Sequence, residues 1–313
     1  MKRMIGLILS ITMLLSLTAC SAEPEAPETE APTAVTDAPT EEATEPPTEV
    51  PNVITPLGME ESVLVDDENC TFSVHFASES EYVGMTLDAV CTNKTDRTLM
   101  FTWNTVSVCG YLYDPLWAEE VAPGESVNST VYIDTFQLEQ YGITSVDEIE
   151  FTLYIFDSAD FMAEPFVNEV FTIYPTGLSA DTYVRPERVS AEGEQVIADN
   201  GDLTFIIESA QWDGDAYTLR CYLRNRTNTA LMYAWEDVAV DGCAIDPVWA
   251  VEVPAGKQAY SDITFYRSQL SKNGIEEPEQ IDFRLTVTNL EDWEADAILD
   301  ETFTFRPEDC AVG

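Results

Sequence analysis

The stretch CTNKTDRTLMFTW at residues 91–103 returns as LRNRTNTALMYAW at residues 223–235, 132 positions further along the chain. The same spacing relates DPLWA at residues 114–118 to DPVWA at residues 246–250. A repeat period of this length is typical of whole duplicated domains and not of a solenoid. The sequence therefore predicts two homologous domains, which we place at residues 53–178 and 179–313.

Apolar residues alternate with polar residues inside each copy, which is the period of a half-buried β-strand. One such row reads MTLDAVC at residues 85–91, and its counterpart reads YTLRCYL at residues 217–223. Cys109-Gly110 and Asp241-Gly242 suit tight hairpin turns that need positive φ angles. A short helix is expected at residues 136–141, ended by Gly142, with an echo at residues 270–274.

Short strands, turn signals at intervals of about eight to twelve residues and a central tryptophan in each copy together describe a β-sandwich. The pattern resembles the immunoglobulin-like domains in surface lipoproteins of low-GC Gram-positive bacteria, and the resemblance spans both copies. It implies an all-β fold with two tandem immunoglobulin-like β-sandwich domains. It implies little about activity, because such folds carry many unrelated functions.

The N-terminus has the layout of a secretory signal peptide. Lys2 and Arg3 form a basic region, residues 5–17 are apolar, and a small residue precedes Cys20. The stretch LTAC at residues 17–20 resembles the lipobox of bacterial lipoproteins, in which the cysteine receives diacylglycerol and becomes the first mature residue. Residues 1–20 are therefore expected to be a signal peptide, and a lipid on Cys20 is expected to anchor the protein to the outer face of the cell membrane.

Residues 21–52 predict a disordered acidic linker rich in Pro, Thr and Glu. They include nine acidic residues, seven prolines and six threonines, without Lys, Arg or an aromatic residue. Such a segment cannot form a core, and its 32 residues could extend to at most about 100 Å in a polyproline conformation. It reads as a stalk that holds the folded part away from the membrane.

The formal charge of −44 argues against nucleic acid as a partner, because so acidic a chain repels phosphate backbones. His75 is the single histidine, and phosphate-binding glycine loops and paired metal-ligand spacings are missing. We therefore predict a protein that is not an enzyme and binds no cofactor or metal. Six cysteines remain after Cys20, three in each copy and not at equivalent positions, which favours mostly free thiols.

Binding of a surface protein or a glycan through loops is the function we expect. Trp212 precedes a hairpin turn, where the first copy has Ser80 at constant spacing. Asp160-Phe161 and Asp292-Trp293 lie in equivalent acidic loops, where the aromatic residue is expected to anchor the loop. Calcium would need more convergent oxygens than these loops suggest. A structural envelope lipoprotein without a ligand and, more remotely, a secreted enzyme or carbohydrate-binding module remain alternatives.

Trp117 and Trp249 each follow an Asp-Pro step at equivalent positions in the two copies. An extended entry followed by a large side chain suits the closure of a sandwich edge. We expect both indole rings to be buried in the core.

Overall fold

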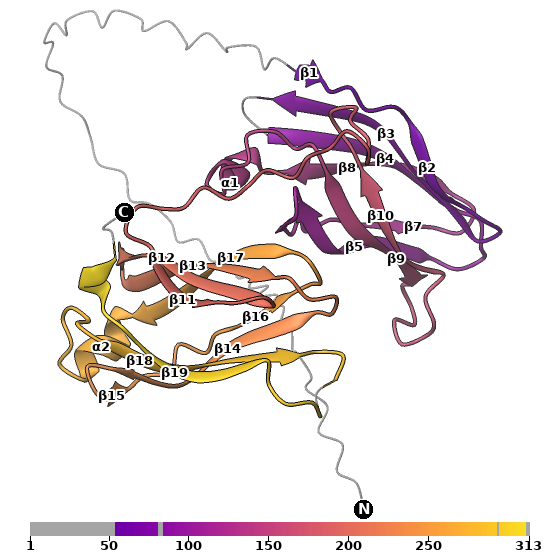
Figure 1. Ribbon diagram of the computed structural model, residues 1–313. Helices are drawn as coiled ribbons and strands as arrows, with labels where there is room; N and C mark the ends of the chain where they lie inside the picture. The colour runs from indigo at the N-terminus through magenta and orange to yellow at the C-terminus, as the bar shows by residue number, and fades with distance from the viewer. Residues whose placement is uncertain (1–53, 81–83, 293, 311–313) are drawn as a thin grey trace, which may run out of the picture. The chain divides into compact units, whose positions relative to one another are not determined.

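The computed structural model describes residues 54–80, 84–292 and 294–310, and this part of the chain is all-β with two short α-helices (Figure 1). Its strands form several sheets, so the predicted all-β, sandwich-like class is confirmed. The predictions for the signal peptide at residues 1–20, Cys20, the linker at residues 21–52 and Trp293 concern positions outside the described residues. No helix among the described residues is long and apolar enough to cross a bilayer.

The first repeat supplies two sheets. The sheet that we call its outer sheet pairs β1 and β2 with β3, then β4 and β8, and its second sheet joins β10, β9 and β5, with β6 and β7 also paired to β5. The elements are β1 (Ile54–Pro56), β2 (Ser62–Asp66), β3 (Cys70–Ser80), β4 (Gly84–Asn93), β5 (Leu99–Val108), β6 (Tyr111–Leu112), β7 (Ala118–Val121), β8 (Ser126–Ile133), α1 (Thr135–Glu139), β9 (Ile149–Asp157) and β10 (Val167–Ile173).

From β2 onward, the strands and the helix of the first repeat recur in the second repeat in the same order and with the same pairings, whereas β1 has no counterpart there (Figure 1). The outer sheet of the second repeat runs β11-β12-β13-β17 and continues into the second sheet of the first repeat, because Gln258 of β17 pairs in parallel with Tyr111 of β6. The second sheet of the second repeat runs from β14 through β18 to β19, with β15 and β16 paired to β14. The elements are β11 (Gln195–Asp199), β12 (Leu203–Asp213), β13 (Ala216–Asn225), β14 (Leu231–Val240), β15 (Cys243–Ala244), β16 (Ala250–Val253), β17 (Gln258–Tyr266), α2 (Arg267–Lys272), β18 (Ile281–Asn289), β19 (Leu299–Phe305) and a 3₁₀ turn, η1 (Pro307–Asp309).

Both outer sheets carry a β-bulge at the same place. The register between β3 and β4 shifts at His75, and the register between β12 and β13 shifts at Glu208. A bulge bends its strand and leaves the extra residue out of the ladder. The two repeats therefore place a titratable residue at an equivalent, irregular position.

Trp117 and Trp249 are buried in the same way at equivalent positions of the two repeats. Trp117 and Trp249 are 8% exposed, and each indole Nε1 donates a hydrogen bond of 3.0 Å to a serine on the facing strand, Ser129 or Ser261. The predicted burial of these two tryptophans is confirmed. A hydrogen-bonded indole can be buried without an unpaired N–H group.

Two fully buried amides, Asn93 and Asn225, tie strand ends together at equivalent positions. Each Nδ2 lies within hydrogen-bond distance of three backbone carbonyls. These carbonyls belong to Arg97, Val121 and Ala122 (2.6–3.2 Å) in the first repeat and to Thr229, Val253 and Pro254 (2.7–3.1 Å) in the second. Each asparagine thus links three backbone carbonyls inside its repeat, and we call this duplicated arrangement the amide bracket.

The hairpin turns have the conformations predicted from the sequence, whereas the helices begin at residues other than those predicted. Cys109 and Asp241 have φ angles of 50° and 49°, and the glycine after each also has a positive φ, as a two-residue hairpin requires. Helix α1 begins at Thr135, one residue before the predicted start, because the Asp134 carboxylate accepts the N–H of Phe136 at 2.9 Å. In the second repeat, α2 begins three residues before the predicted segment.

Tyrosines connect the two repeats. Tyr260 on β17 stacks on Tyr111 with 5.8 Å between ring centroids and on Tyr141 with 4.6 Å. The Arg220 guanidinium lies 4.8 Å from the centre of the Tyr260 ring and donates to the carbonyl of Gln140 at 3.2 Å. All the described residues belong to one compact unit.

Candidate functional site

The residues that the sequence predicted for binding do not come together in the second repeat. Trp212 lies at the turn between β12 and β13, where β13 begins. Asp292 follows Asn289, which pairs with Leu231 close to the other end of β13. Since β13 has ten residues, about 30 Å separates these two ends.

Trp212 is a half-buried side chain whose ring is already engaged. Its Nε1 donates to Glu277 at 2.8 Å, the Arg267 guanidinium lies 3.8 Å from the ring centre, and Tyr217 meets the ring edge-on. Strand pairing makes Glu79 its counterpart, so the equivalence with Ser80 at constant spacing was wrong. The geometry of Trp212 is that of a packed side chain and not of an open stacking platform.

The acidic loop after β9 is exposed at its tip. Phe161 is 70% exposed, so the expectation that it anchors the loop was wrong. The loop turns through its backbone instead, with the N–H of Asp160 donating to the carbonyl of Asp157 at 3.0 Å. Asp160 and Asp292 are exposed. Among the residues described, no group of three or more His, Cys, Asp or Glu side chains could hold a metal ion.

The buried thiols are poorly suited to nucleophilic chemistry. Burial raises the pKa of Cys70 to about 12, and it also raises the pKa of Cys91 and of Cys221. A thiol becomes a nucleophile only as the thiolate, so these groups are unreactive near neutral pH.

His75 lies with its Nε2 2.6 Å from Ser73 Oγ and its Nδ1 3.6 Å from a carboxylate oxygen of Glu61.

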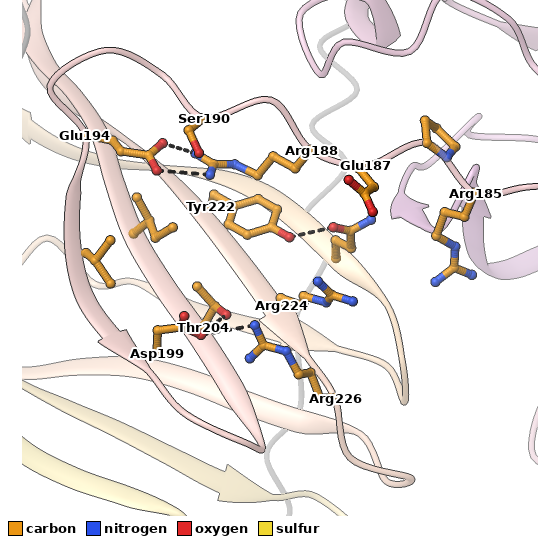
Figure 2. A pocket seen from close by; sticks show the side chains of 14 residues that line it. Arg185, Glu187, Arg188, Ser190, Glu194, Asp199, Thr204, Tyr222, Arg224 and Arg226 are labelled. Atoms are coloured by element: carbon orange, nitrogen blue, oxygen red, sulfur yellow. Dashed lines mark hydrogen bonds and ion pairs between the residues drawn. The ribbon is translucent and has the colours of Figure 1, made fainter.

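A polar pocket of about 560 Å³ opens on the outer sheet of the second repeat (Figure 2). Residues of β11, β12, β13 and β17 form its floor, and the segment that precedes β11 forms one wall. Four arginines line the pocket, namely Arg185, Arg188, Arg224 and Arg226. The whole chain has 14 Lys and Arg against 58 Asp and Glu, so this concentration of positive charge stands out.

A buried ion cluster fixes the wall of the pocket to its floor. Arg188 pairs with Glu194 and, at 2.6 Å, with Glu208, which also lies 3.3 Å from Arg220. Burial by itself lowers the pKa of Arg188, but its hydrogen bonds to the two glutamates raise it overall. Burial by itself raises the pKa of Glu194, but the hydrogen bond from Arg188 lowers it overall. Arg188 is therefore a structural cation that also covers the Tyr222 ring at 4.4 Å.

Arg226 belongs to a scaffold that both repeats share. It donates to Asp199 at 3.0 Å, and the Thr204 hydroxyl donates to the same carboxylate oxygen at 2.8 Å. The pKa of Asp199 is lowered by the hydrogen bond from Thr204 and then by that from Arg226. The first repeat has the same arrangement in Asp66, Thr71 and Lys94.

Three other pocket residues also have hydrogen-bond partners. The Tyr222 hydroxyl donates to Gln258 Oε1 at 2.5 Å, and both residues are buried. Arg185 donates to the carbonyl of Gly256 at 3.0 Å. These hydrogen bonds hold the pocket side chains in place, and they do not depend on a bound ligand.

Arg224 differs from the other three arginines. It is exposed on β13, and its guanidinium makes no hydrogen bond or ion pair among the described residues, although its charge helps to lower the pKa of Asp199. Figure 2 shows its guanidinium between Tyr222 and Arg226, with no interaction drawn to it. In the first repeat the equivalent residue is Thr92, whose hydroxyl bonds to Ser126 at 2.8 Å. The guanidinium of Arg224 in the second repeat is therefore open to a ligand, whereas the Thr92 hydroxyl in the first repeat already has a hydrogen-bond partner.

No protein-family model matches this chain, and no curated protein matches it. The pocket is therefore interpreted from its own geometry.

The sequence prediction missed this pocket. A usable signal was present, since Arg220, Arg224 and Arg226 fall within seven residues of an otherwise acidic chain. The alternation of β13 places Arg220 and Arg224 on the face opposite the core-facing Leu219 and Leu223, and Arg226 follows directly after the strand. The contribution of Arg188 and Glu194 could not be seen, because it depends on how the preceding segment folds back over the sheet.

Proposed function

We propose that the chain is an extracellular surface protein with two tandem immunoglobulin-like domains, at residues 53–178 and 179–313, on a disordered stalk. The strand order that β2 to β10 share with β11 to β19 supports this division, as do two hydrophobic clusters, each formed mainly by one repeat. The Pro-rich composition of residues 21–52 supports the stalk.

Its membrane attachment is a lipid on Cys20. The support is the basic start, the apolar run and the LTAC stretch of the N-terminus. Replacement of Cys20 by Ala in the source cell is expected to move the protein from the membrane fraction to the medium. Retention of Cys20→Ala in the membrane fraction would contradict this anchor.

Its activity is non-catalytic binding of a ligand in the pocket of the second repeat. The observation that carries this proposal is the exposed, uncommitted Arg224 in a 560 Å³ polar pocket. An arginine whose guanidinium makes no hydrogen bond or ion pair within the described part of so acidic a protein is available to a ligand of opposite charge. The buried cluster around Arg188 supports the same proposal, because a fixed wall reduces the entropic cost of ordering the site on binding.

The test is retention of cell-envelope material by the immobilised mature chain, residues 21–313. Arg224→Thr converts the pocket residue into its first-repeat counterpart. Arg97→Thr, which removes an exposed arginine from the first repeat, is the charge-matched control. Wild type and Arg97→Thr are expected to retain a component that Arg224→Thr loses. Equal retention by all three proteins, or retention by none, would favour the alternative of a structural spacer without a ligand.

A further inference from the structure

Most of the charged and aromatic residues on the outer face of the second repeat have structural partners. Arg220 and Tyr260 contact the first repeat, Arg188 joins the buried ion cluster, and Arg226 belongs to the shared scaffold. Among the described residues that line the pocket, Arg224 is the one arginine whose guanidinium makes no hydrogen bond or ion pair. Its place in the fold is set by the rigid β13–β17 pairing, opposite Gln258.

The charge of the pocket limits the ligand. One uncommitted guanidinium can neutralise one negative charge, and its parallel N–H donors match the two oxygens of a carboxylate. Glu187, Glu194 and Asp199 also line the pocket. A doubly charged anion such as phosphate would meet excess negative charge there, whereas a monoanion would not.

The remaining polar groups favour a hydroxylated ligand body. Ser190 and Tyr222 contribute hydroxyls to the lining, and Gln258 contributes a carboxamide. Gln258 accepts a hydrogen bond from Tyr222 through its Oε1, and its Nε2 donates no hydrogen bond within the described part of the chain. Such groups bind sugar hydroxyls, and about 560 Å³ accommodates a monosaccharide.

We infer that the pocket binds a monoanionic sugar acid, with the carboxylate paired to the Arg224 guanidinium and the hydroxyls facing Ser190, Tyr222 and Gln258. This inference rests on the proposed binding function and specifies its ligand class. Glu187 has no ion-pair partner among the described residues and lines the same pocket, so its charge opposes the ligand.

Calorimetric titration of the mature chain with D-glucuronate and D-galacturonate at constant ionic strength tests the inference. D-glucose controls for the hydroxyls without the carboxylate, and inorganic phosphate controls for charge. Arg224→Thr is expected to weaken binding of the sugar acid roughly 10- to 100-fold, because it removes a charge-assisted pair. Arg97→Thr should bind as wild type does, and Glu187→Gln should bind more tightly.

The inference would be overturned by equal binding of the acid to wild type and Arg224→Thr, by binding of glucose or phosphate at least as tight as that of the acids, or by weaker binding to Glu187→Gln. Absence of any sugar-acid binding would also overturn it. If envelope retention still depends on Arg224 in that case, the proposed binding function stands and only the ligand class fails. If neither assay depends on Arg224, both proposals fail.

Discussion

The two repeats share a scaffold and differ on one face. Both have the buried Asn bracket, the indole bonded to serine, and the Asp–Thr–cation group at the edge of the outer sheet. On the outer face, however, Asp88, Val90 and Thr92 of β4 are replaced by Arg220, Tyr222 and Arg224 of β13. Features present in both repeats are explained by folding, so the residues that differ are the ones that need another explanation.

The largest expected effect concerns the shared core. Trp117→Ala and Trp249→Ala each remove a buried indole and should lower the free energy of unfolding of their own repeat by about 3–5 kcal/mol. Thermal unfolding of the full mature chain measures this loss. A midpoint within a degree or two of wild type for one variant but not the other would show that the two scaffolds are not equivalent.

The buried ion cluster is a feature of the second repeat that the first repeat lacks at its bulge. Arg188→Met should destabilise the protein by about 3 kcal/mol, because it leaves the carboxylates of Glu194 and Glu208 without their main partner. His75→Gln at the equivalent bulge should change stability by less than about 0.5 kcal/mol. Chemical denaturation compares them.

The additional variant Arg188→Met/Glu208→Gln should recover part of the stability lost by Arg188→Met alone, since it removes one uncompensated charge. No recovery would mean that Arg188 acts through packing on Tyr222 and not through charge.

The amide bracket should matter equally in both repeats. Asn93→Ala and Asn225→Ala each leave buried carbonyls without a donor, and each should cost about 1–3 kcal/mol. Denaturant unfolding measures the loss. A large cost for one variant and a negligible cost for the other would contradict the duplicated role of the bracket.

The smallest expected effect is a pH dependence from Glu194. Because its pKa in the folded protein is lowered, its contribution to stability is fully present above the unfolded pKa of roughly 4 and is lost as the pH falls below that value. Between pH 6 and pH 3, the melting temperature of wild type should therefore fall more steeply than that of Glu194→Gln. Parallel curves would mean that the Arg188–Glu194 pair does not hold the wall of the pocket.

The sequence predicted those parts of the fold that depend on local pattern. Alternation gave the all-β class, the dipeptides Cys109-Gly110 and Asp241-Gly242 gave the hairpins, and the duplicated Trp117 and Trp249 gave two core residues. The predicted loop residues were less informative. An aromatic residue such as Phe161 can be anchored or exposed, and its sequence neighbours do not decide which.

The candidate site depends on contacts between distant segments. Arg188 meets Glu208 across 20 positions, and Gln258 meets Tyr222 across 36. Sequence could have pointed to the basic cluster on β13, but it could not tell which of those arginines are already paired. That distinction required the geometry.

Hydrogen–deuterium exchange of the full mature chain, with and without saturating D-glucuronate, tests most directly the claim that the second repeat carries the binding site on a scaffold common to both. The account predicts slower amide exchange at residues 185–190 and 222–226, and unchanged exchange at the equivalent residues 90–94 of the first repeat. Slower exchange at residues 90–94, or no change at residues 222–226, would contradict it.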